Sequence, residues 1–314
     1  MEPNPPQFRT WPEDGTLDQW IAPDGWKHRV FRIGNGTRGK MLVLGGRGDM
    51  IEKYLEIIAY FVSGGWAVTA FDWRGQGGSG RTMADPTVGH MADFGQWIAD
   101  LGDFAQDWQA QGAGPHVVLA HSMGGFLALR AMVESAIRPD AAVLTAPMLG
   151  LNGGSIPRWL VRTIIAAMLR IAGPTGAAWT QNETSAVRLR ARQRRLTHSL
   201  SRQEDELYWR RTSPEVSLGP PSWAWLDQAY RATDALVRSP ALAQMNVPTL
   251  ILGTDADQLV SPDAIRQVSA LLPDAHLHMY GAEAAHEILR ESDTVRLDAL
   301  ARIDAFWDAR APRP

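Results

Sequence analysis

The fold of this chain is decided by nine residues, Val117-Val118-Leu119-Ala120-His121-Ser122-Met123-Gly124-Gly125. The apolar, β-branched start of the stretch predicts a buried strand, and the residues after it are typical of a helix. Ser122 therefore lies on a sharp turn between the two elements. A serine at such a turn presents its hydroxyl above the end of a sheet, where it can act as a nucleophile.

Small residues on both sides of Ser122 support this interpretation. A strand and a helix that meet at a nucleophilic serine pack closely only if the residues two before and two after it are small. Gly124 meets the requirement, and Ala120 stands where the G-x-S-x-G pattern has its first glycine. The alternative is a strand, turn and helix that carry a serine by chance, so the partners of Ser122 decide between the two.

Strands and helices alternate outward from this stretch. The expected strands are two that flank a hairpin turn at Asp24-Gly25, followed by residues 41–44, 67–72, 116–120, 141–145, 249–253 and 276–280. Helices are expected at residues 51–63, 91–111, 124–135, 262–271 and after Asp293. This order predicts an α/β fold with a mostly parallel eight-stranded sheet and helices on both faces. Because the alternation breaks down between residues 147 and 240, we predict a core formed by 1–146 and 241–314, with an inserted helical cap formed by 147–240.

The composition narrows the classes of function. The 314 residues carry a net charge of −3, which gives no support to a nucleic-acid partner, and they include no cysteine, which excludes disulfides and thiolate nucleophiles. The N-terminal residues lack the basic and apolar segments of a signal peptide, and residues 156–173 are too short and too charged for a membrane span. We therefore expect a cytoplasmic protein.

A serine nucleophile of this kind needs an acid and a histidine later in the chain, in that order. Asp257 lies in the loop after the strand at 249–253 and is the preferred acid, with Asp255 in the same loop as the alternative. His286 lies six residues after the strand at 276–280, in a loop of small residues, and is the preferred base among the eight histidines. A histidine that titrates near neutral pH suits proton transfer to and from Ser122.

Two backbone N–H groups are expected to bind the negative charge that develops on the substrate. One belongs to Met123, directly after the nucleophile, and the other to the loop Gly45-Gly46-Arg47-Gly48, with Arg47 as the preferred donor. The glycines of this loop allow a turn and a close approach to the substrate. The loop does not complete a phosphate-binding motif, and the glycine-rich segment 75–80 lacks the context of a dinucleotide site.

These segments resemble the lysophospholipase and monoacylglycerol-lipase branch of the α/β-hydrolase superfamily. The matching segments are, in family order, residues 45–49, 71–79, 120–125, 145–148, 257–260 and 285–289. The resemblance implies that Ser122, Asp257 and His286 form a catalytic triad, with Met123 and Arg47 as the oxyanion donors. Two departures are Gly45-Gly46 in place of the family's His-Gly, and Ala120 in place of the first glycine of the elbow.

The resemblance also implies a function. We expect a serine hydrolase that cleaves small carboxylic esters through an acyl-enzyme, without a metal or an organic cofactor, and whose substrates are lysophospholipids or monoacylglycerols. The residues expected to line the substrate site are Gly46, His121, Trp223 and Trp225. A peptidase or thioesterase on the same scaffold, or an inactive binding protein that keeps the fold, are the alternatives.

The inserted segment is rich in arginine. Residues 158–202 contain nine arginines, no lysine and one acid, Glu183. This charge predicts peripheral contact with an anionic lipid surface, the alternative being a solvated helix face with local ion pairs. Within the segment, an apolar stripe is expected to form the core of the cap; its members are Trp159, Leu160, Ile164 and Met168.

Overall fold

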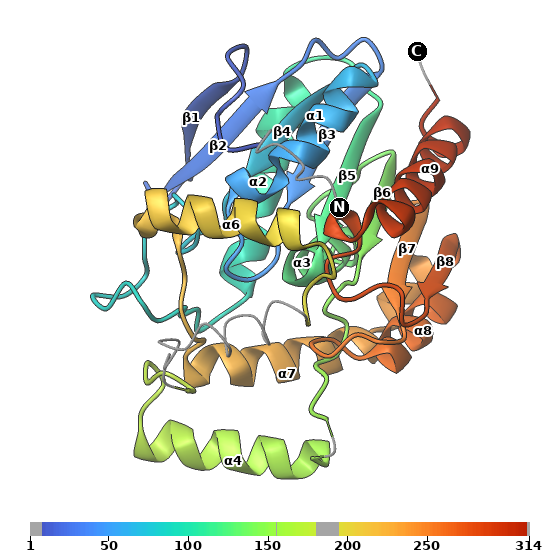
Figure 1. Cartoon of the computed structure of the whole chain (residues 1–314). Helices are drawn as coiled ribbons and strands as arrows, with labels where there is room; N and C mark the ends of the chain where they lie inside the picture. Colours follow the sequence, from blue (N-terminus) through green and yellow to red (C-terminus); the bar gives the residue numbers. More distant parts are fainter. Residues whose placement is uncertain (1–7, 155, 180–194, 313–314) are drawn as a thin grey trace.

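A computed structural model describes residues 8–154, 156–179 and 195–312 (Figure 1). Its centre is an eight-stranded sheet with the strand order β1-β2-β4-β3-β5-β6-β7-β8. The strands are β1 (Thr16–Ile21), β2 (Lys27–Ile33), β3 (Gly39–Leu44), β4 (Trp66–Phe71), β5 (His116–His121), β6 (Ala141–Thr145), β7 (Thr249–Thr254) and β8 (Ala275–Tyr280). The predicted eight-stranded sheet is confirmed.

The sheet is parallel except at one edge. β1 pairs with β2 and β2 with β4 in antiparallel register, whereas every pairing from β4 through β8 is parallel. The hairpin between β1 and β2 turns at Gly25, whose φ of 86° lies in the region that glycine adopts without strain. Since parallel strands end at the same edge, the loops after β3, β5, β7 and β8 all emerge together.

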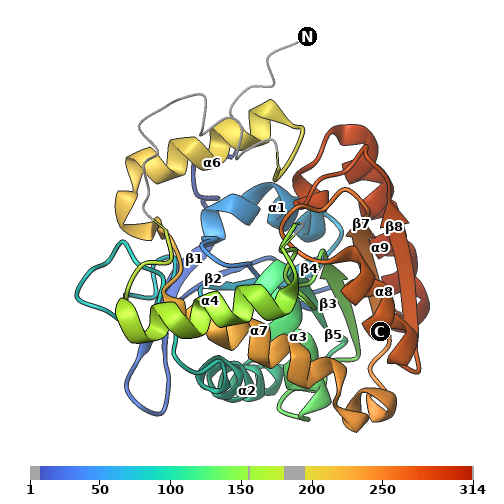
Figure 2. The same cartoon turned by 90° about the horizontal axis from the view of Figure 1, so that it is seen from below.

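Helices cover both faces of the sheet (Figure 2). Right-handed crossovers that run in the direction from β4 to β8 all place their helices on one face of the sheet. The crossover from β3 to β4 runs in the opposite direction, so its helix lies on the other face. The first group contains α2 (Gly95–Ala110), α3 (Ser122–Val133) and α8 (Pro262–Leu271), and the second contains α1 (Leu55–Ser63) and the C-terminal α9 (Asp293–Arg310). The helix expected at residues 51–63 begins with a 3₁₀ turn, η1 (Ile51–Tyr54).

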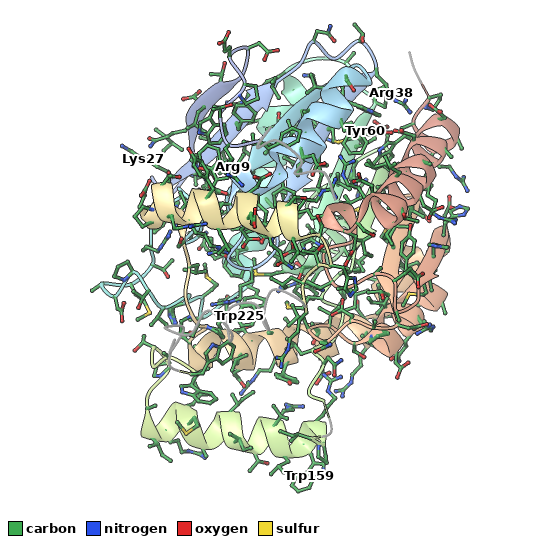
Figure 3. All side chains as sticks on the ribbon, viewed as in Figure 1. Arg9, Lys27, Arg38, Tyr60, Trp159 and Trp225 are labelled. Carbon is green, nitrogen blue, oxygen red and sulfur yellow. The ribbon has the colours of Figure 1, made fainter. Side chains whose placement is uncertain are left out.

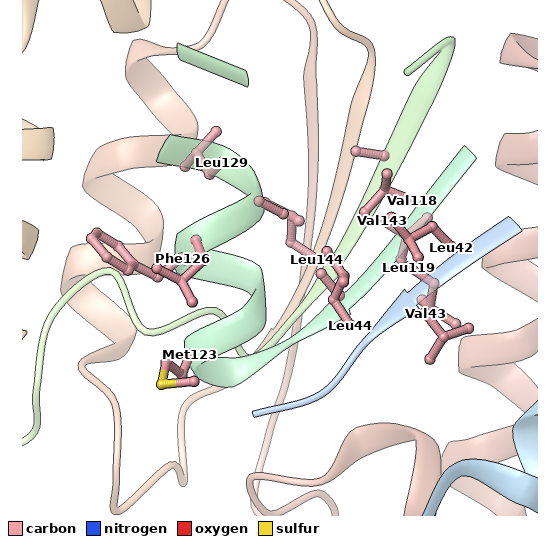
Figure 4. Close-up of a cluster of buried hydrophobic side chains, with 14 of the residues drawn as sticks. Leu42, Val43, Leu44, Val118, Leu119, Met123, Phe126, Leu129, Val143 and Leu144 are labelled. Atoms are coloured by element: carbon pink, nitrogen blue, oxygen red, sulfur yellow. The ribbon is translucent and has the colours of Figure 1, made fainter. Parts of the chain in front are cut away.

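The central strands are apolar over most of their length because helices bury both faces (Figure 4). Alternate residues of β5 point to opposite sides, so Val118 and Leu119 contribute to the cores on both faces and are 1% and 3% exposed. From α3, Met123, Phe126 and Leu129 are fully buried in the same core. This packing holds the start of α3 firmly against the end of β5, where Ser122 lies.

Among the described residues between β6 and β7 there are three α-helices, α4 (Arg158–Ile171), α6 (Leu200–Thr212) and α7 (Trp223–Val237). α7 packs on the main core through Trp225, Ala229 and Leu236. α4 packs on the outer side of α7, around Ile165 and Tyr230, and so forms the outermost layer (Figure 1). The division of the chain into a core and a cap at residues 147 and 240 stays a prediction.

The apolar stripe expected in the cap core faces outward instead. Trp159 is 69% exposed, Ile164 44% and Leu160 36%, and Trp159 points away from the rest of the molecule (Figure 3). The prediction is therefore wrong for these three residues, although Met168 does pack against α7. α4 carries apolar residues around most of its circumference, and only contact with α7 selects the face around Ile165 for burial. Among the helices of the described residues, none is long and apolar enough to cross a membrane.

Candidate active site

Ser122 occupies a strained turn between β5 and α3. Its φ is 52°, a value that residues other than glycine rarely adopt. A glycine is needed two residues later because a Cβ on Gly124 would lie 2.4 Å from the carbonyl oxygen of Gly45 and 2.8 Å from that of Leu44. The turn therefore brings Ser122 and the loop after β3 into direct contact.

His286 and Asp257 reach Ser122 from the two neighbouring loops. The Nε2 atom of His286 lies 2.9 Å from Oγ of Ser122, and its Nδ1 lies 2.7 Å from Oδ2 of Asp257. His286 and Asp257 are each 3% exposed. The three side chains thus form a continuous hydrogen-bonded series from the loops after β8 and β7 to the end of β5.

The partners of His286 determine its tautomer. An ionised carboxylate only accepts hydrogen bonds, so Nδ1 of His286 carries the proton and Nε2 accepts from the Ser122 hydroxyl. The other carboxylate oxygen of Asp257 accepts the backbone N–H groups of Leu259 and Val260 at 2.8 and 3.0 Å. Burial opposes ionisation of Asp257, but His286 and these N–H groups outweigh it and lower the pKa of the carboxyl.

Asp255 has a different environment. Its side chain is 54% exposed and forms an ion pair with Arg266 on α8. Its backbone N–H donates to the carbonyl of Tyr280, which joins the ends of β7 and β8. Of the two carboxylates considered from the sequence, only Asp257 lies beside His286.

The loop after β3 is held by hydrogen bonds on both sides of Arg47. The N–H of Gly46 donates to Oδ2 of Asp49 at 2.7 Å, and the N–H of Gly48 donates to Oε1 of Gln76 at 2.6 Å. An ideal Cβ on Gly46 would lie 3.0 Å from Cβ of Ser122, so only glycine allows this approach. The loop and the backbone of Met123 at the start of α3 therefore lie on adjacent sides of Ser122.

A cavity of about 1130 Å³ opens above Ser122 and His286. Much of its apolar lining comes from α7 and from the loops after β6 and β7, and it includes Met148, Leu151, Leu218, Trp225, Leu226, Leu259 and Val260. Gly46 and His121 also line it, as expected from the sequence. Trp223 does not belong to this lining: it is buried with Ile165 and Tyr230 between α7 and α4, because successive residues of a helix point in different directions.

His121 lines the cavity next to the nucleophile. Its Nδ1 lies 3.1 Å from the carbonyl oxygen of Thr145, and its ring centre lies 4.8 Å from that of His286. Burial and then the charge of His286 lower the pKa of His121 to about 3, so its imidazole is neutral at neutral pH. With the proton on Nδ1, its Nε2 is an acceptor.

Charged side chains that the sequence pattern did not reveal form the other part of the lining. They include Asp49, Lys53, Glu206, Arg210 and Glu287. They come from the loop after β3, η1, α6 and the loop after β8. No short motif joins such distant segments, and Lys53 on its own looks like the polar side of an amphipathic helix.

Comparison with known proteins agrees with this geometry. The chain is 29% identical to lysophospholipase L2 of Escherichia coli strain K12 over 283 residues, which cover 85% of this chain and 80% of that protein. It is 25% identical to the probable lysophospholipase L2 of Haemophilus influenzae, over 88% of this chain and 86% of that protein. The expected resemblance to this branch is confirmed.

Solved structures share the fold. A soluble variant of monoglyceride lipase from Saccharomyces cerevisiae superposes with a TM-score of 0.75 at 18% identity, over 98% of this chain and all of that one. A thermostable carboxyl esterase from Bacillus coagulans gives 0.70 at 16% identity, over 95% and 99%. The sequence model of the family described as serine aminopeptidase, S33, matches residues 35–293. The chain therefore belongs to this family of α/β hydrolases.

Proposed function

We propose that Ser122, His286 and Asp257 are the catalytic triad of an ester hydrolase whose substrates carry a single acyl chain on a glycerol-based head group. The observation that carries the proposal is the hydrogen-bonded series from Asp257 through His286 to Oγ of Ser122, at 2.7 and 2.9 Å, at the base of a large cavity. The two relatives named lysophospholipase L2 support this class of substrate.

Each step of the reaction follows from the positions of these atoms. Oγ of Ser122 attacks the ester carbonyl while Nε2 of His286 takes the hydroxyl proton, and Asp257 stabilises the resulting imidazolium. His286 then gives this proton to the leaving alkoxide, which departs as the alcohol and leaves an acyl-serine. A water molecule, deprotonated by His286, then attacks the carbonyl of the acyl-serine. The bond from this carbonyl to Oγ breaks, the carboxylic acid leaves, and His286 returns the proton to Oγ of Ser122.

The backbone N–H groups of Met123 and Arg47 are the proposed donors to the tetrahedral oxyanion. The hydrogen bonds that Gly46 and Gly48 donate hold the loop on both sides of Arg47, which supports a fixed donor position. Loss of one such donor typically lowers kcat by about 10²–10³-fold. The lining residues proposed to contact the substrate are Gly46, His121 and Trp225.

The lining of the cavity favours an ester with an acyl chain over an aminoacyl substrate. Its apolar part, which includes Leu151, Leu226 and Val260, offers a surface for hydrocarbon. An aminopeptidase needs a carboxylate for the α-ammonium group of its substrate. The acids in the lining are Asp49, Glu206, Glu287 and Glu215; the first three already pair with a lysine or arginine, and Glu215 is exposed.

A substrate series tests this proposal. Monoacylglycerols, lysophospholipids and acyl thioesters of several chain lengths are compared with aminoacyl amides, for the wild type and for Ser122→Ala. We expect hydrolysis of the single-chain esters by the wild type and loss of that activity in Ser122→Ala. Equal rates for the two proteins would exclude Ser122 as the nucleophile, and a preference for aminoacyl amides would favour a peptidase. If no substrate is cleaved and Ser122 is not labelled by a fluorophosphonate, the chain is an inactive binding protein.

We further propose that α4 contacts an anionic membrane surface. Its exposed apolar side chains are Trp159, Leu160, Ile164 and Ile171, and they lie among three arginines, Arg158, Arg162 and Arg170. Asp234 pairs with Arg158 and Arg162, which leaves two net positive charges among these four residues. Four further arginines of the segment, 188, 190, 192 and 194, and Glu183 lie outside the described residues. A chain without cysteine suits the reducing cytoplasm, where such contact would be peripheral.

Sedimentation with lipid vesicles tests this contact. Trp159→Ser combined with Ile164→Ser is expected to abolish binding to phosphatidylglycerol vesicles, while Leu297→Ser, which changes an exposed leucine of α9, leaves it intact. Arg170→Gln is expected to weaken binding about fivefold, from about 1 kcal/mol per basic residue at an anionic surface. Equal binding to phosphatidylcholine vesicles would refute the role of the arginines.

A further inference from the structure

Six buried or half-buried charged residues join three separate parts of the active site. We call them the ion ring; they are Asp49, Lys53, Glu287, Arg290, Glu206 and Arg210. Asp49 and Lys53 belong to the loop after β3 and to η1. Glu287 directly follows His286, Arg290 ends the 3₁₀ turn η4 (Ile288–Arg290), and Glu206 and Arg210 lie on α6. The reaction proposed above uses none of the six.

The first half of the ion ring connects the loop after β3 with the histidine loop. One carboxylate oxygen of Asp49 accepts the N–H of Gly46 at 2.7 Å and the Tyr54 hydroxyl at 2.6 Å, and the other accepts Nζ of Lys53 at 2.5 Å. Nζ of Lys53 also donates to Oε1 of Glu287 at 2.6 Å. Lys53 therefore bridges Asp49, which holds Gly46, to Glu287, the neighbour of His286.

The second half returns from the histidine loop to the loop after β3 by way of α6. Arg290 donates to Oε2 of Glu287 at 2.6 Å and to Oε2 of Glu206 at 2.8 Å. Oε1 of Glu206 accepts Nε of Arg210 at 2.9 Å, and Nη2 of Arg210 donates to the carbonyl oxygen of Gly48 at 3.1 Å. The series that begins at Gly46 thus closes at Gly48, on the other side of Arg47.

The charges of the ion ring balance, with three cations and three anions. Burial favours the neutral form of each group, but the opposite charges overcome it: they raise the pKa of Lys53 and Arg290 and lower the pKa of Asp49 and Glu206. Lys53, Arg290, Asp49 and Glu206 are therefore charged at neutral pH. In a site of low dielectric constant, removal of one charge leaves its partner without compensation. A change at one member of the ion ring therefore affects the other members.

We propose that Glu206 and Arg210 are positioning residues, which transmit the docking of α6 to the loop after β3 and to His286 through the ion ring. This inference rests on the proposed function of Ser122 and His286. The ion ring contacts the chain at Gly46 and Gly48, on both sides of Arg47, and at Glu287, beside His286. A shift of α6 therefore moves the backbone at these positions. Correct placement of α6 is then a condition for the chemical step, and not only for substrate binding.

Arg210 offers the cleanest test because its side chain is 26% exposed, the most of the six, and a substitution there is the least harmful to folding. Arg210→Gln removes the charge and the donor to Gly48, while Arg210→Lys keeps the charge. The matched control is Arg211→Gln, since the exposed Arg211 donates to the carbonyl of Leu207 within α6. Melting temperature and circular dichroism check that each variant folds.

The substrate is p-nitrophenyl acetate, which has no glycerol head group. Arg210→Gln is expected to lower kcat about 10- to 100-fold with little change in KM, as misplacement of catalytic groups does. Its affinity for a boronic acid that mimics the tetrahedral intermediate is expected to fall in parallel. Arg210→Lys is expected to recover most of the lost kcat, and Arg211→Gln to match the wild type.

Three results would overturn the inference. An unchanged kcat for Arg210→Gln on p-nitrophenyl acetate, with a raised KM for a lysophospholipid, would make Arg210 a head-group contact. An equal loss in Arg211→Gln would assign the effect to the general stability of α6. Failure of Arg210→Lys to recover activity would show that charge in the ion ring is not what matters. All three differ from failure of the proposed function, in which Ser122→Ala would keep the activity.

Discussion

Substitution of Gly124 by alanine tests whether the elbow and the loop after β3 are locked together. A Cβ at this position would lie 2.4 Å from the carbonyl oxygen of Gly45. This oxygen also accepts the indole N–H of Trp73 at 2.8 Å, so the loop cannot retreat without loss of that hydrogen bond. Because the obstacle is backbone, no rotation of a side chain relieves the clash.

The magnitude follows from two opposing effects. Alanine is favoured over glycine inside a helix by about 1 kcal/mol. An ordinary contact begins near 3.4 Å, so the loop must move by about 1 Å, and such overpacking costs about 1–3 kcal/mol or more. We therefore expect a net loss of up to about 2 kcal/mol in the free energy of unfolding. Displacement of the loop by about 1 Å is expected to lower kcat about 100-fold.

Gly102→Ala is the matched control. Gly102 lies inside α2, where a Cβ would meet its nearest neighbour, the carbonyl oxygen of Ala136, at 3.4 Å. Here the helix preference is unopposed, so we expect higher stability by up to about 1 kcal/mol and an unchanged kcat. Urea unfolding and hydrolysis of p-nitrophenyl acetate measure both quantities. Gly124→Ala with the stability and kcat of the wild type would refute the locked geometry.

Three further substitutions probe single groups. Asp257→Asn is expected to lower kcat about 10⁴-fold, because the amide no longer orients the His286 ring, while Asp255→Asn keeps the activity; the reverse result in steady-state kinetics would reassign the acid. His121 has a pKa of about 3 in the folded protein, whereas its ordinary pKa is 6.5. As the pH falls, His121 is therefore protonated in the unfolded chain before it is protonated in the folded protein. The free energy of unfolding then decreases below about pH 6.5, by about 1.4 kcal/mol per pH unit. His121→Gln is expected to reduce this slope in urea unfolding between about pH 6 and pH 4, and His276→Gln, at an exposed site on β8, is the control. Arg202→Gln is expected to lower the free energy of unfolding by about 3–5 kcal/mol, since Glu56 loses the two hydrogen bonds of 2.7 Å that Arg202 donates; a melting temperature equal to that of the wild type would contradict this role.

Local patterns in the sequence determined the architecture. Apolar strands separated by amphipathic helices predict a parallel sheet whose loops emerge at one edge, because period and burial are properties of neighbouring residues. The small residues around Ser122 and the glycines of residues 45–48 could also be interpreted from the sequence alone. A close approach between two backbone segments requires small residues, whatever the rest of the fold. His286 was identified by its place in a small-residue loop after the last strand.

Only the tertiary structure decided which side chains meet. The sequence favours Asp257 but leaves Asp255 open as the acid, and the turn after β7 directs Asp257 toward His286 and Asp255 toward Arg266. The exposed face of α4 is set by its contact with α7, because an apolar residue has the same preference for burial on either side of a helix. The ion ring joins residues from positions 49 to 290, and pairing of charges so distant in sequence depends on distances and burial that exist only in the folded chain.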